Sequence, residues 1–460
     1  MKATLFICSI LLSGATLVAS TGDIDYSQGI FIVNEDWYGH QNSTVNYLLP
    51  DDPSGEYWHY RVIQAENPGK ELGCTNQYGA IWNGRFYFIA KQAKDPGADI
   101  KGGRITVADA STMKILHQSE LIDPSGNKCD GRGFIGVDEH KGYISTSNGV
   151  WILDLDTYQV KGQIESTANP DAGNLYKGQC GSMVESGGRI FVAHQSLGVL
   201  VIDPATDSVT ATIGMDCVNE TAGVGSVVRV RDGSVWASVA RNTSGQGQTM
   251  PCLIRIDPST LTTETIDIPD GMYAPSNSWY AWTPDSFCAS SVSDCLYWSG
   301  SANTWFSGQN IYRFDTGNRH MERIIDLSAD GENWKLYGCS MRVHPVTDEI
   351  YMSLYHDFSD PSYITRRYTP SGEKIRDYEM ISNYWFPSIP VFPGRRAESI
   401  SDAATDKPIR VWTEPGAIHV EGSDTFEVYD TSGRLCSPAR LAPGIYIVVT
   451  PHSSHKVSVK

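Results

Sequence analysis

A tight-turn motif recurs along the chain, at successive intervals of 57, 45, 49, 54, 58 and 54 residues. In its clearest form an Asp is followed within three residues by Ser or Thr. Copies stand at Asp109, Asp154, Asp203, Asp257 and Asp315, with related forms at Asp52 and Thr369. An Asp side chain accepts hydrogen bonds from the backbone two residues on, and Pro and Ser or Thr complete such turns. Each copy therefore predicts a tight turn between two strands.

The segments around these turns predict four short strands for each repeat. Residues 188–213, GRIFVAHQSLGVLVIDPATDSVTATI, contain three of them, and a further apolar segment, CGSMVESG, comes before. Four strands in about 45 to 58 residues are typical of one blade of a β-propeller. Seven turns predict seven blades, and the spare strand in residues 383–394 is expected to close the ring beside the first blade. A β-sandwich array is the alternative arrangement.

The chain divides into four parts. Residues 1–20 have the charged start, apolar stretch and small-residue end of a secretory signal peptide. The propeller is expected over residues 28–395, a linker over 396–407, and a small β-sandwich module over 408–460. No later stretch approaches 18 apolar residues, the length that a membrane span needs. The sequence thus predicts an all-β, exported protein that does not span a membrane.

Composition limits the possible partners. The 53 acidic and 36 basic residues give a net charge of −17, which excludes a general nucleic-acid binder. Aromatic residues make up 10% of the chain and charged residues only 19%, so the sequence is not that of a disordered segment.

The cysteines are compatible with disulfides in an exported chain. Nine remain after Cys8 in the signal peptide. The best predicted pair is Cys288 with Cys295, across an expected hairpin, and the next is Cys217 with Cys252, in loops that flank one repeat. The odd number leaves at least one free thiol.

Aromatic residues gather where the loops of one propeller face are expected. An Asn precedes an aromatic residue just before five of the predicted inner strands, and the second strand of the first blade ends in further aromatic and polar residues. Rings with polar tips beside amides favour a pocket for a flat or sugar-like ligand. The predicted ligand-binding residues are Trp37, Tyr38, His40, Asn42, Tyr78, Tyr176, His194, Trp279, Trp334, His356, Tyr384 and Trp385. Packing between blades is the alternative role for each ring.

Catalytic and cofactor motifs give little support to an enzyme. The sequence has no His-Glu-x-x-His, no Gly-x-Ser-x-Gly and no phosphate-binding glycine loop. His40, His194 and His356 each follow a predicted second strand, so a pair of them could act as a general base. We predict no resident cofactor, no metal site and no assigned catalytic residue. Whether the protein is an enzyme stays open, with binding favoured.

Three resemblances extend this interpretation. VIDPATDSVTATI is similar to repeats of YncE-like seven-bladed propellers, and GIFIVNEDWYGHQNSTVNYL resembles the first blade of a Bacteroidetes surface-propeller family. The matching residues are Asn34-Glu35, Trp37-Tyr38, Gly39 and Asn42-Ser43. The best-understood members of that family capture cobalamin at the outer membrane and pass it to a TonB-dependent transporter. FEVYDTSGRL, LAPGIYIV and KVSVK resemble the C-terminal sorting domain of the type IX secretion system.

These observations together predict a secreted or cell-surface binding propeller. The resemblance implies a corrinoid or other tetrapyrrole as its ligand and a TonB-dependent transporter as a partner. A propeller-type lyase or lactonase and an adhesin for glycans or proteins are the alternatives.

Overall fold

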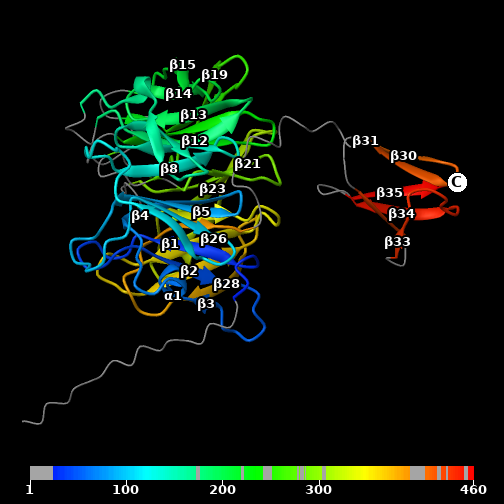
Figure 1. The fold of residues 1–460 in the computed structure, drawn as a ribbon, viewed down its shortest axis with the longest axis horizontal. Coiled ribbons are helices and arrows are strands. Elements are labelled where there is room, and N and C mark those ends of the chain that lie inside the picture. Colours follow the sequence, from blue (N-terminus) through cyan, green and yellow to red (C-terminus); the bar gives the residue numbers. More distant parts are fainter. Residues whose placement is uncertain are drawn as a thin grey trace, which may run out of the picture.

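The computed structural model describes residues 24–171, 177–218, 222–241, 251–276, 279, 284, 286–302, 307–393, 410–421, 426–430, 434–449 and 454–459. Figure 1 shows an all-β body followed by a small group of C-terminal strands. The predicted signal peptide, Tyr176 and the predicted linker lie outside the described residues. In the described part of the chain, no helix is both long and apolar enough to cross a membrane.

Residues 30–391 fold into antiparallel sheets of four or five strands. The first sheet consists of β29 (Pro387–Val391), β1 (Ile30–Asn34), β2 (Thr44–Leu48) and β3 (Trp58–His59), with the short helix α1 (Val62–Glu66) beside β2. The second consists of β4 (Cys74–Trp82), β5 (Arg85–Gln92), β6 (Ile105–Asp109) and β7 (Ile115–Ser119). The third consists of β8 (Gly131–Gly136), β9 (Lys141–Thr146), β10 (Gly149–Asp154) and β11 (Val160–Gln163), followed by the 3₁₀ turn η1 (Glu165–Thr167).

The remaining sheets of this body repeat the same order. The fourth consists of β12 (Cys180–Ser186), β13 (Arg189–His194), β14 (Gly198–Asp203) and β15 (Ser208–Ile213). The fifth consists of β16 (Ala222–Arg229), β17 (Val235–Arg241), β18 (Cys252–Ile256) and β19 (Thr263–Asp267). The sixth consists of β20 (Cys288–Ala289), β21 (Cys295–Gly300), β23 (Asn310–Asp315) and β24 (His320–Asp326), followed by η2 (Leu327–Asp330). The seventh consists of β22 (Ser307–Gly308), β25 (Lys335–Val343), β26 (Ile350–Tyr355), β27 (Tyr363–Tyr368) and β28 (Lys374–Glu379).

One strand of each sheet lies next to one strand of the following sheet, which makes the fold propeller-like. Contacts join β4 to β8, β8 to β12, β12 to β16, β16 to β20, β20 to β25, β25 to β29 and β29 to β4. The spare strand predicted in residues 383–394 is confirmed, because β29 pairs antiparallel with β1 through Phe31–Val391 and Val33–Ile389. The last part of the body therefore completes its first sheet and covers an edge that would otherwise be open.

The core lies between neighbouring sheets, because central strands such as β13 and β14 are buried on both of their faces. The rings of Tyr87 and Phe134, from the second and third sheets, stack with centroids 4.1 Å apart. Trp82 packs so closely on Gly136 that a Cβ there would lie 2.1 Å from the indole. Only glycine fits at this position, so the third sheet can approach the second.

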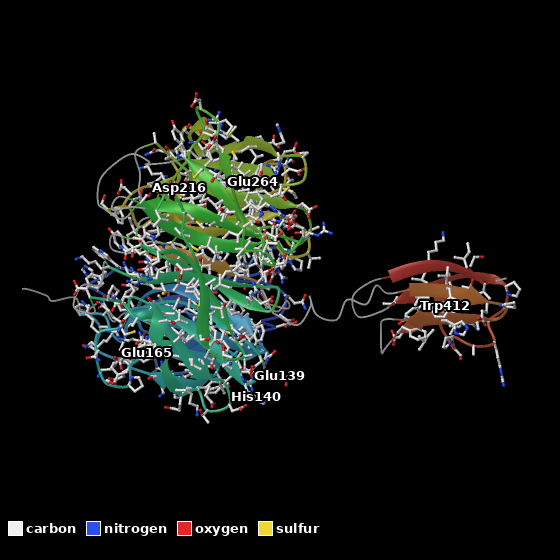
Figure 2. The ribbon with its side chains drawn as sticks, turned by 90° about the horizontal axis from the view of Figure 1, so that it is seen from above. Glu139, His140, Glu165, Asp216, Glu264 and Trp412 are labelled. Atoms are coloured by element: carbon white, nitrogen blue, oxygen red, sulfur yellow. The ribbon has the colours of Figure 1, made fainter. Side chains whose placement is uncertain are left out.

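The predicted Asp turns are confirmed. Asp109 Oδ1 accepts a hydrogen bond from the Ser111 N–H over 3.1 Å, and Asp257 Oδ1 accepts one from the Ser259 N–H over 2.8 Å. Acidic side chains such as Glu139 and Glu264 lie at the outside of the body (Figure 2), where Glu264 pairs with Arg319 over 2.6 Å.

The C-terminal strands form two further antiparallel sheets. One contains β30 (Arg410–Glu414) and β31 (Ala417–Glu421), and the other contains β33 (Leu435–Cys436), β32 (Glu427–Asp430), β34 (Gly444–Val449) and β35 (Ser454–Val459). They share an apolar cluster that includes Ile418, Val428, Tyr446 and Val448. The outward ring of Trp412 stacks on His419 at 5.3 Å (Figure 2).

All nine cysteines in the described residues are free thiols in the structure. Cys217 and Cys252 are both buried, and their side chains are in hydrogen-bonding contact. Cys288 stands opposite Tyr297, whereas Cys295 stands opposite Ser290, whose N–H donates to the Cys295 carbonyl. Cys288 and Cys295 are thus diagonal neighbours, typically about 7 Å apart at Cα, near the upper limit for a disulfide. The geometry favours the Cys217–Cys252 pair over the Cys288–Cys295 pair.

Candidate ligand-binding face

One edge of the body brings together several of the predicted ligand-binding residues. The strands β1, β5 and β26 end at this edge, while β4, β25 and β29 begin there, since neighbouring strands are antiparallel. Residues 35–43, here called the Trp37 loop, connect β1 to β2 at this edge. Its base is held by the backbone, as the N–H groups of Glu35 and Asp36 donate to the carbonyls of Phe386 and Trp385.

Trp37 is the centre of a group of stacked rings. Its ring lies 3.7 Å from that of His40 and 4.1 Å from that of Tyr384, measured between centroids. Trp37 is 38% exposed and Tyr38 is 57% exposed. The structure therefore stacks three predicted residues, Trp37, His40 and Tyr384, next to the exposed Tyr38. It leaves large apolar surfaces open to solvent, which is unusual for rings that only pack in a core.

A second stack lies at the beginning of β25. The rings of Trp334 and His356 are 3.7 Å apart, and His356 Nδ1 lies 2.9 Å from Asp360 Oδ2. Trp334 is nevertheless only 8% exposed, and its indole N–H donates to Glu332. Both rings of this pair are thus held by hydrogen-bonding neighbours.

An aromatic cluster follows β25 and β26 on the same edge. Phe358, which is 53% exposed, lies 5.5 Å from Phe386 and 6.2 Å from Tyr337 between ring centroids. Tyr355 and Tyr363 pack beneath it. Because Phe386 directly follows Trp385 and Tyr384, this cluster continues the surface that starts at the Trp37 stack.

Other predicted residues have structural partners instead. Tyr78 donates to the Phe134 carbonyl, and Trp385, 1% exposed, donates to the Ile381 carbonyl. Trp279 is wholly buried, with its indole N–H on the Val224 carbonyl. Asn42 is 3% exposed and ties the Trp37 loop to the carbonyl of Ile100 over 2.8 Å. These side chains therefore do not belong to the candidate surface.

His194 also has a structural position. It is 2% exposed, and its Nδ1 accepts hydrogen bonds from the N–H groups of Ser196 and Leu197. Burial lowers the pKa of His194 to about 4. The imidazole is therefore neutral at physiological pH and organises the turn between β13 and β14.

A group of buried and half-buried polar side chains lies at the same edge, and the sequence patterns did not identify it. Glu35 Oε1 accepts a hydrogen bond from Gln77 Nε2 over 2.7 Å, and Tyr337 also hydrogen-bonds this carboxyl group. Burial raises the pKa of Glu35, while the nearby Lys91 charge opposes that shift. Burial, with the positive charge of Arg132, lowers the pKa of Lys91 to about 7. These residues come from the first, second, third and seventh sheets, so they converge only in the fold.

Further polar contacts lead from Arg132 to the fourth sheet. Arg132 donates to Gln179 Oε1 over 2.7 Å, and Gln179 Nε2 donates to the Trp279 carbonyl over 3.1 Å. Shifted pKa values and buried charges of this kind gather at functional sites. Two signals in the sequence point to them: Gln77 stands inside the repeated Asn-x-aromatic pattern, and Lys91 is a charge directly after the apolar strand segment 86–90.

Asp36 is a buried residue at the base of the Trp37 loop. Its Oδ2 accepts a hydrogen bond from Thr44 Oγ1 over 2.7 Å, and its Oδ1 accepts one from Gln41. Burial raises the pKa of Asp36 to about 7. Across the described ranges, no group of three or more His, Cys, Asp or Glu side chains is arranged to hold a metal ion.

Fold and site together define an all-β, propeller-like protein with an aromatic and polar face at one edge of its sheets. The chain belongs to the family described as a domain of unknown function, DUF5074, whose model matches residues 28–393. A search of curated proteins gives no match.

Two solved structures illustrate what the chain is similar to. A chain of the mitotic checkpoint complex shares 11% sequence identity, with 85% of this chain and 89% of that chain covered and a TM-score of 0.45. The computationally designed protein Ika8 shares 10% identity, with 84% and 98% covered and a TM-score of 0.40.

Proposed function

We propose that this protein is an exported binding protein that captures a small ligand on the edge formed by the Trp37 loop. The observation that carries the proposal is the exposed stack of Trp37, His40 and Tyr384 beside the Phe358 cluster. Stacked rings offer flat apolar surface at low conformational cost, and the buried polar groups beneath them can fix the orientation of a ligand.

The leading ligand class is a corrinoid or another tetrapyrrole. The resemblance of the first repeat to cobalamin-capturing propellers supports it, and so does the combination of rings with amide and charged groups. A flat macrocycle would lie on the Trp37 stack and on Phe358, while its polar substituents would reach toward Gln77 and Lys91. A TonB-dependent transporter would be the partner that receives such a ligand.

We also propose the finer architecture and location. The seven sheets within residues 30–391, with neighbouring first strands in contact, support a closed seven-bladed propeller. The two small sheets after residue 409 support a C-terminal β-sandwich, and their sequence resemblance supports a sorting role at the cell surface. The charged, apolar and small-residue regions of residues 1–20 support export.

Enzymatic activity as a lyase or lactonase is the second candidate. It is favoured by the Glu35 and Lys91 pair, because opposite pKa shifts in adjacent groups are typical of acid–base sites. Glu35→Gln would then abolish turnover of a lactone or uronate while leaving binding measurable. An unchanged rate would remove this candidate.

An absorbance and calorimetric titration of the mature protein with cyanocobalamin, cobinamide and haem tests the proposal. We expect a saturable spectral shift with at least one of them, since stacking on indole and phenol rings changes the environment of the macrocycle. Absence of both heat and spectral change with all three would remove the tetrapyrrole assignment. Native mass spectrometry of protein from its own host would then identify any other retained ligand.

A further inference from the structure

The C-terminal strand β34 is apolar on both of its faces. Tyr446 and Val448 are buried in the cluster between the two C-terminal sheets. Ile445, Ile447 and Val449 alternate with them and therefore point to the other side of the sheet, where they are 44%, 40% and 36% exposed. Strands with apolar side chains on both faces are typical of sheets that are covered on both sides. Among the described residues, only the inner side of β34 is covered.

The strands beside β34 extend this exposed surface. Tyr429 of β32 stands opposite Ile447 on one side and opposite Leu435 of β33 on the other, and Leu435 is 60% exposed. Since cross-strand partners point to the same side of a sheet, these three residues form a row across three strands. With Ile445 and Val449 they make one apolar surface, here called the Ile447 face. An exposed apolar patch that spans several strands marks an interaction surface.

The Ile447 face carries one charge of each sign, on opposite flanks. Glu427 stands opposite Val449 on the β32 side, and Lys456 stands opposite Ile447 on the β35 side. Both charged side chains are exposed, and no described residue forms an ion pair with either of them. Tyr429 OH donates to Glu427 Oε2 over 2.6 Å, which holds the carboxylate beside the apolar residues. A surface with one acidic and one basic flank is complementary to a second copy of itself.

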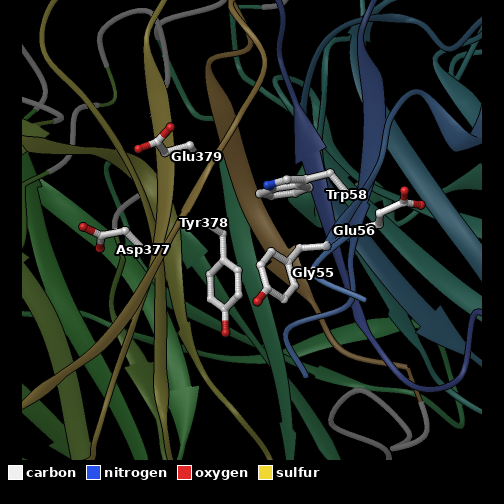
Figure 3. A pocket seen from close by; sticks show the side chains of 7 residues that line it. Gly55, Glu56, Trp58, Asp377, Tyr378 and Glu379 are labelled. Atoms are coloured by element: carbon white, nitrogen blue, oxygen red, sulfur yellow. The ribbon is translucent and has the colours of Figure 1, made fainter. Parts of the chain in front are cut away.

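The described part of the body offers the Ile447 face no comparable surface. Away from the Trp37 loop, its exposed large apolar side chains are spread over different sheets, as Leu116 and Leu197 are. The hollow between β3 and β28 is lined by aromatic rings such as that of Tyr378 (Figure 3). The Arg376 guanidinium, 5.4 Å from the Tyr57 ring centroid, already covers one of these rings. The match for an apolar sheet face is therefore the same face of another copy.

We propose that two copies of this protein associate through their Ile447 faces. The two sheets would pack face to face about 10 Å apart, the usual spacing of stacked sheets, with the apolar side chains of β34 between them. In a two-fold symmetric contact each residue pair occurs twice, so Glu427 of each copy would lie beside Lys456 of the partner subunit. The contact involves no residue of the Trp37 loop, so it is independent of what that loop binds.

Sedimentation equilibrium of the mature protein over a range of concentrations tests the association. We expect a reversible dimer. Ile447→Thr keeps a β-branched side chain but makes it polar, and it should raise the dimer dissociation constant about tenfold or more, because the change occurs in both copies. Trp412→Ala is the matched control: Trp412 is 44% exposed but lies on β30, in the other C-terminal sheet. This variant should associate as the wild type does.

Charge reversal tests the arrangement of the two copies. Glu427→Lys alone, or Lys456→Glu alone, would bring like charges together across the contact, and each should weaken the dimer about tenfold. An equimolar mixture of these two variants should recover the association. One copy then carries two positive flanks and its partner carries two negative flanks, so every facing pair is attractive again.

Three results would overturn the proposal. The first is the mass of a single chain at every concentration. The second is a dimer that Ile447→Thr leaves unchanged, since the contact would then lie elsewhere on the molecule. The third is a mixture of the two charge variants that associates no better than either variant alone, since that would exclude the two-fold contact.

Discussion

Asn42 and Asp95 hold two loops of neighbouring sheets together. The Asp95 N–H donates to Asn42 Oδ1 over 2.8 Å, and Asp95 Oδ2 in turn accepts the Gly39 N–H over 2.8 Å. Both side chains are almost wholly buried. The position of the Trp37 ring therefore depends on a polar contact between two residues that are themselves buried.

Replacement of Asn42 by Ala should loosen this loop. It would leave the Asp95 N–H and the Ile100 carbonyl without their partners, at a cost of about 1–3 kcal/mol. We expect faster hydrogen exchange in residues 35–43 and weaker ligand binding. Tyr38→Ala is the control, since Tyr38 is exposed on the same loop: it should weaken binding without changing exchange. Unchanged exchange in Asn42→Ala would contradict the anchoring role.

His194 should make the fold sensitive to acid. Its folded pKa of about 4 lies below the ordinary value of 6.5, so the unfolded state binds more protons between these pH values. The stability that neutral His194 provides is present above pH 6.5 and is lost as pH falls toward 4, by about 3 kcal/mol. In His194→Asn, whose side-chain oxygen can accept the same two N–H groups, this part of the pH dependence should disappear. Denaturant unfolding of both proteins at several pH values measures it, and parallel curves would contradict it.

Titration of Asp36 should change the stability of the fold with pH in the opposite direction to titration of His194. Burial raises its folded pKa to about 7, so the folded state binds more protons than the unfolded state between about pH 4 and 7. Its contribution to stability is present at low pH and is lost as pH rises through 7, by about 4 kcal/mol. Asp36→Asn should therefore gain stability relative to the wild type as pH increases over this interval. A constant difference between the two proteins would show that Asp36 does not titrate in this way.

Cys217 and Cys252 should form a disulfide in an oxidising medium. Their thiols are in contact, and the bond would close residues 217–252 into a loop, with a stabilisation of about 2–4 kcal/mol. Oxidised glutathione accepts the electrons and is reduced as the bond forms. Peptide mapping without reductant should recover the linked pair, and Cys217→Ser should remove both the linked peptide and the added stability. Recovery of Cys288 linked to Cys295 instead would contradict the preference inferred from the register.

Local patterns predicted those features that depend on short segments. The Asp turns, the strands between them and the closing strand β29 follow from backbone chemistry and alternation over a few residues, and Asp109 and Asp257 accept the bonds expected of them. The presence of an aromatic residue just before an inner strand was equally visible. The direction in which such a ring points could not be predicted, because it depends on the neighbouring sheet.

Trp279 and Tyr384 show the difference. Both follow an Asn near the beginning of an inner strand, yet Trp279 is turned inward onto the Val224 carbonyl, whereas Tyr384 stacks on Trp37. For the same reason, the sequence did not predict the polar groups at the same edge of the body. No sequence motif contains Glu35, Gln77 and Lys91 together. They become neighbours only where the first and second sheets meet.

Calorimetric titration of matched tryptophan variants with cyanocobalamin tests whether the Trp37 loop binds the ligand. Trp37 and Trp412 have similar exposure, 38% and 44%, but Trp412 belongs to the C-terminal sheets. If the Trp37 loop binds the ligand, Trp37→Ala should weaken binding by about tenfold or more, the loss expected when a stacking ring of about 1.5 kcal/mol is removed. Trp412→Ala should bind as the wild type does. Equal affinity in wild type and Trp37→Ala, or a loss confined to Trp412→Ala, would contradict the account.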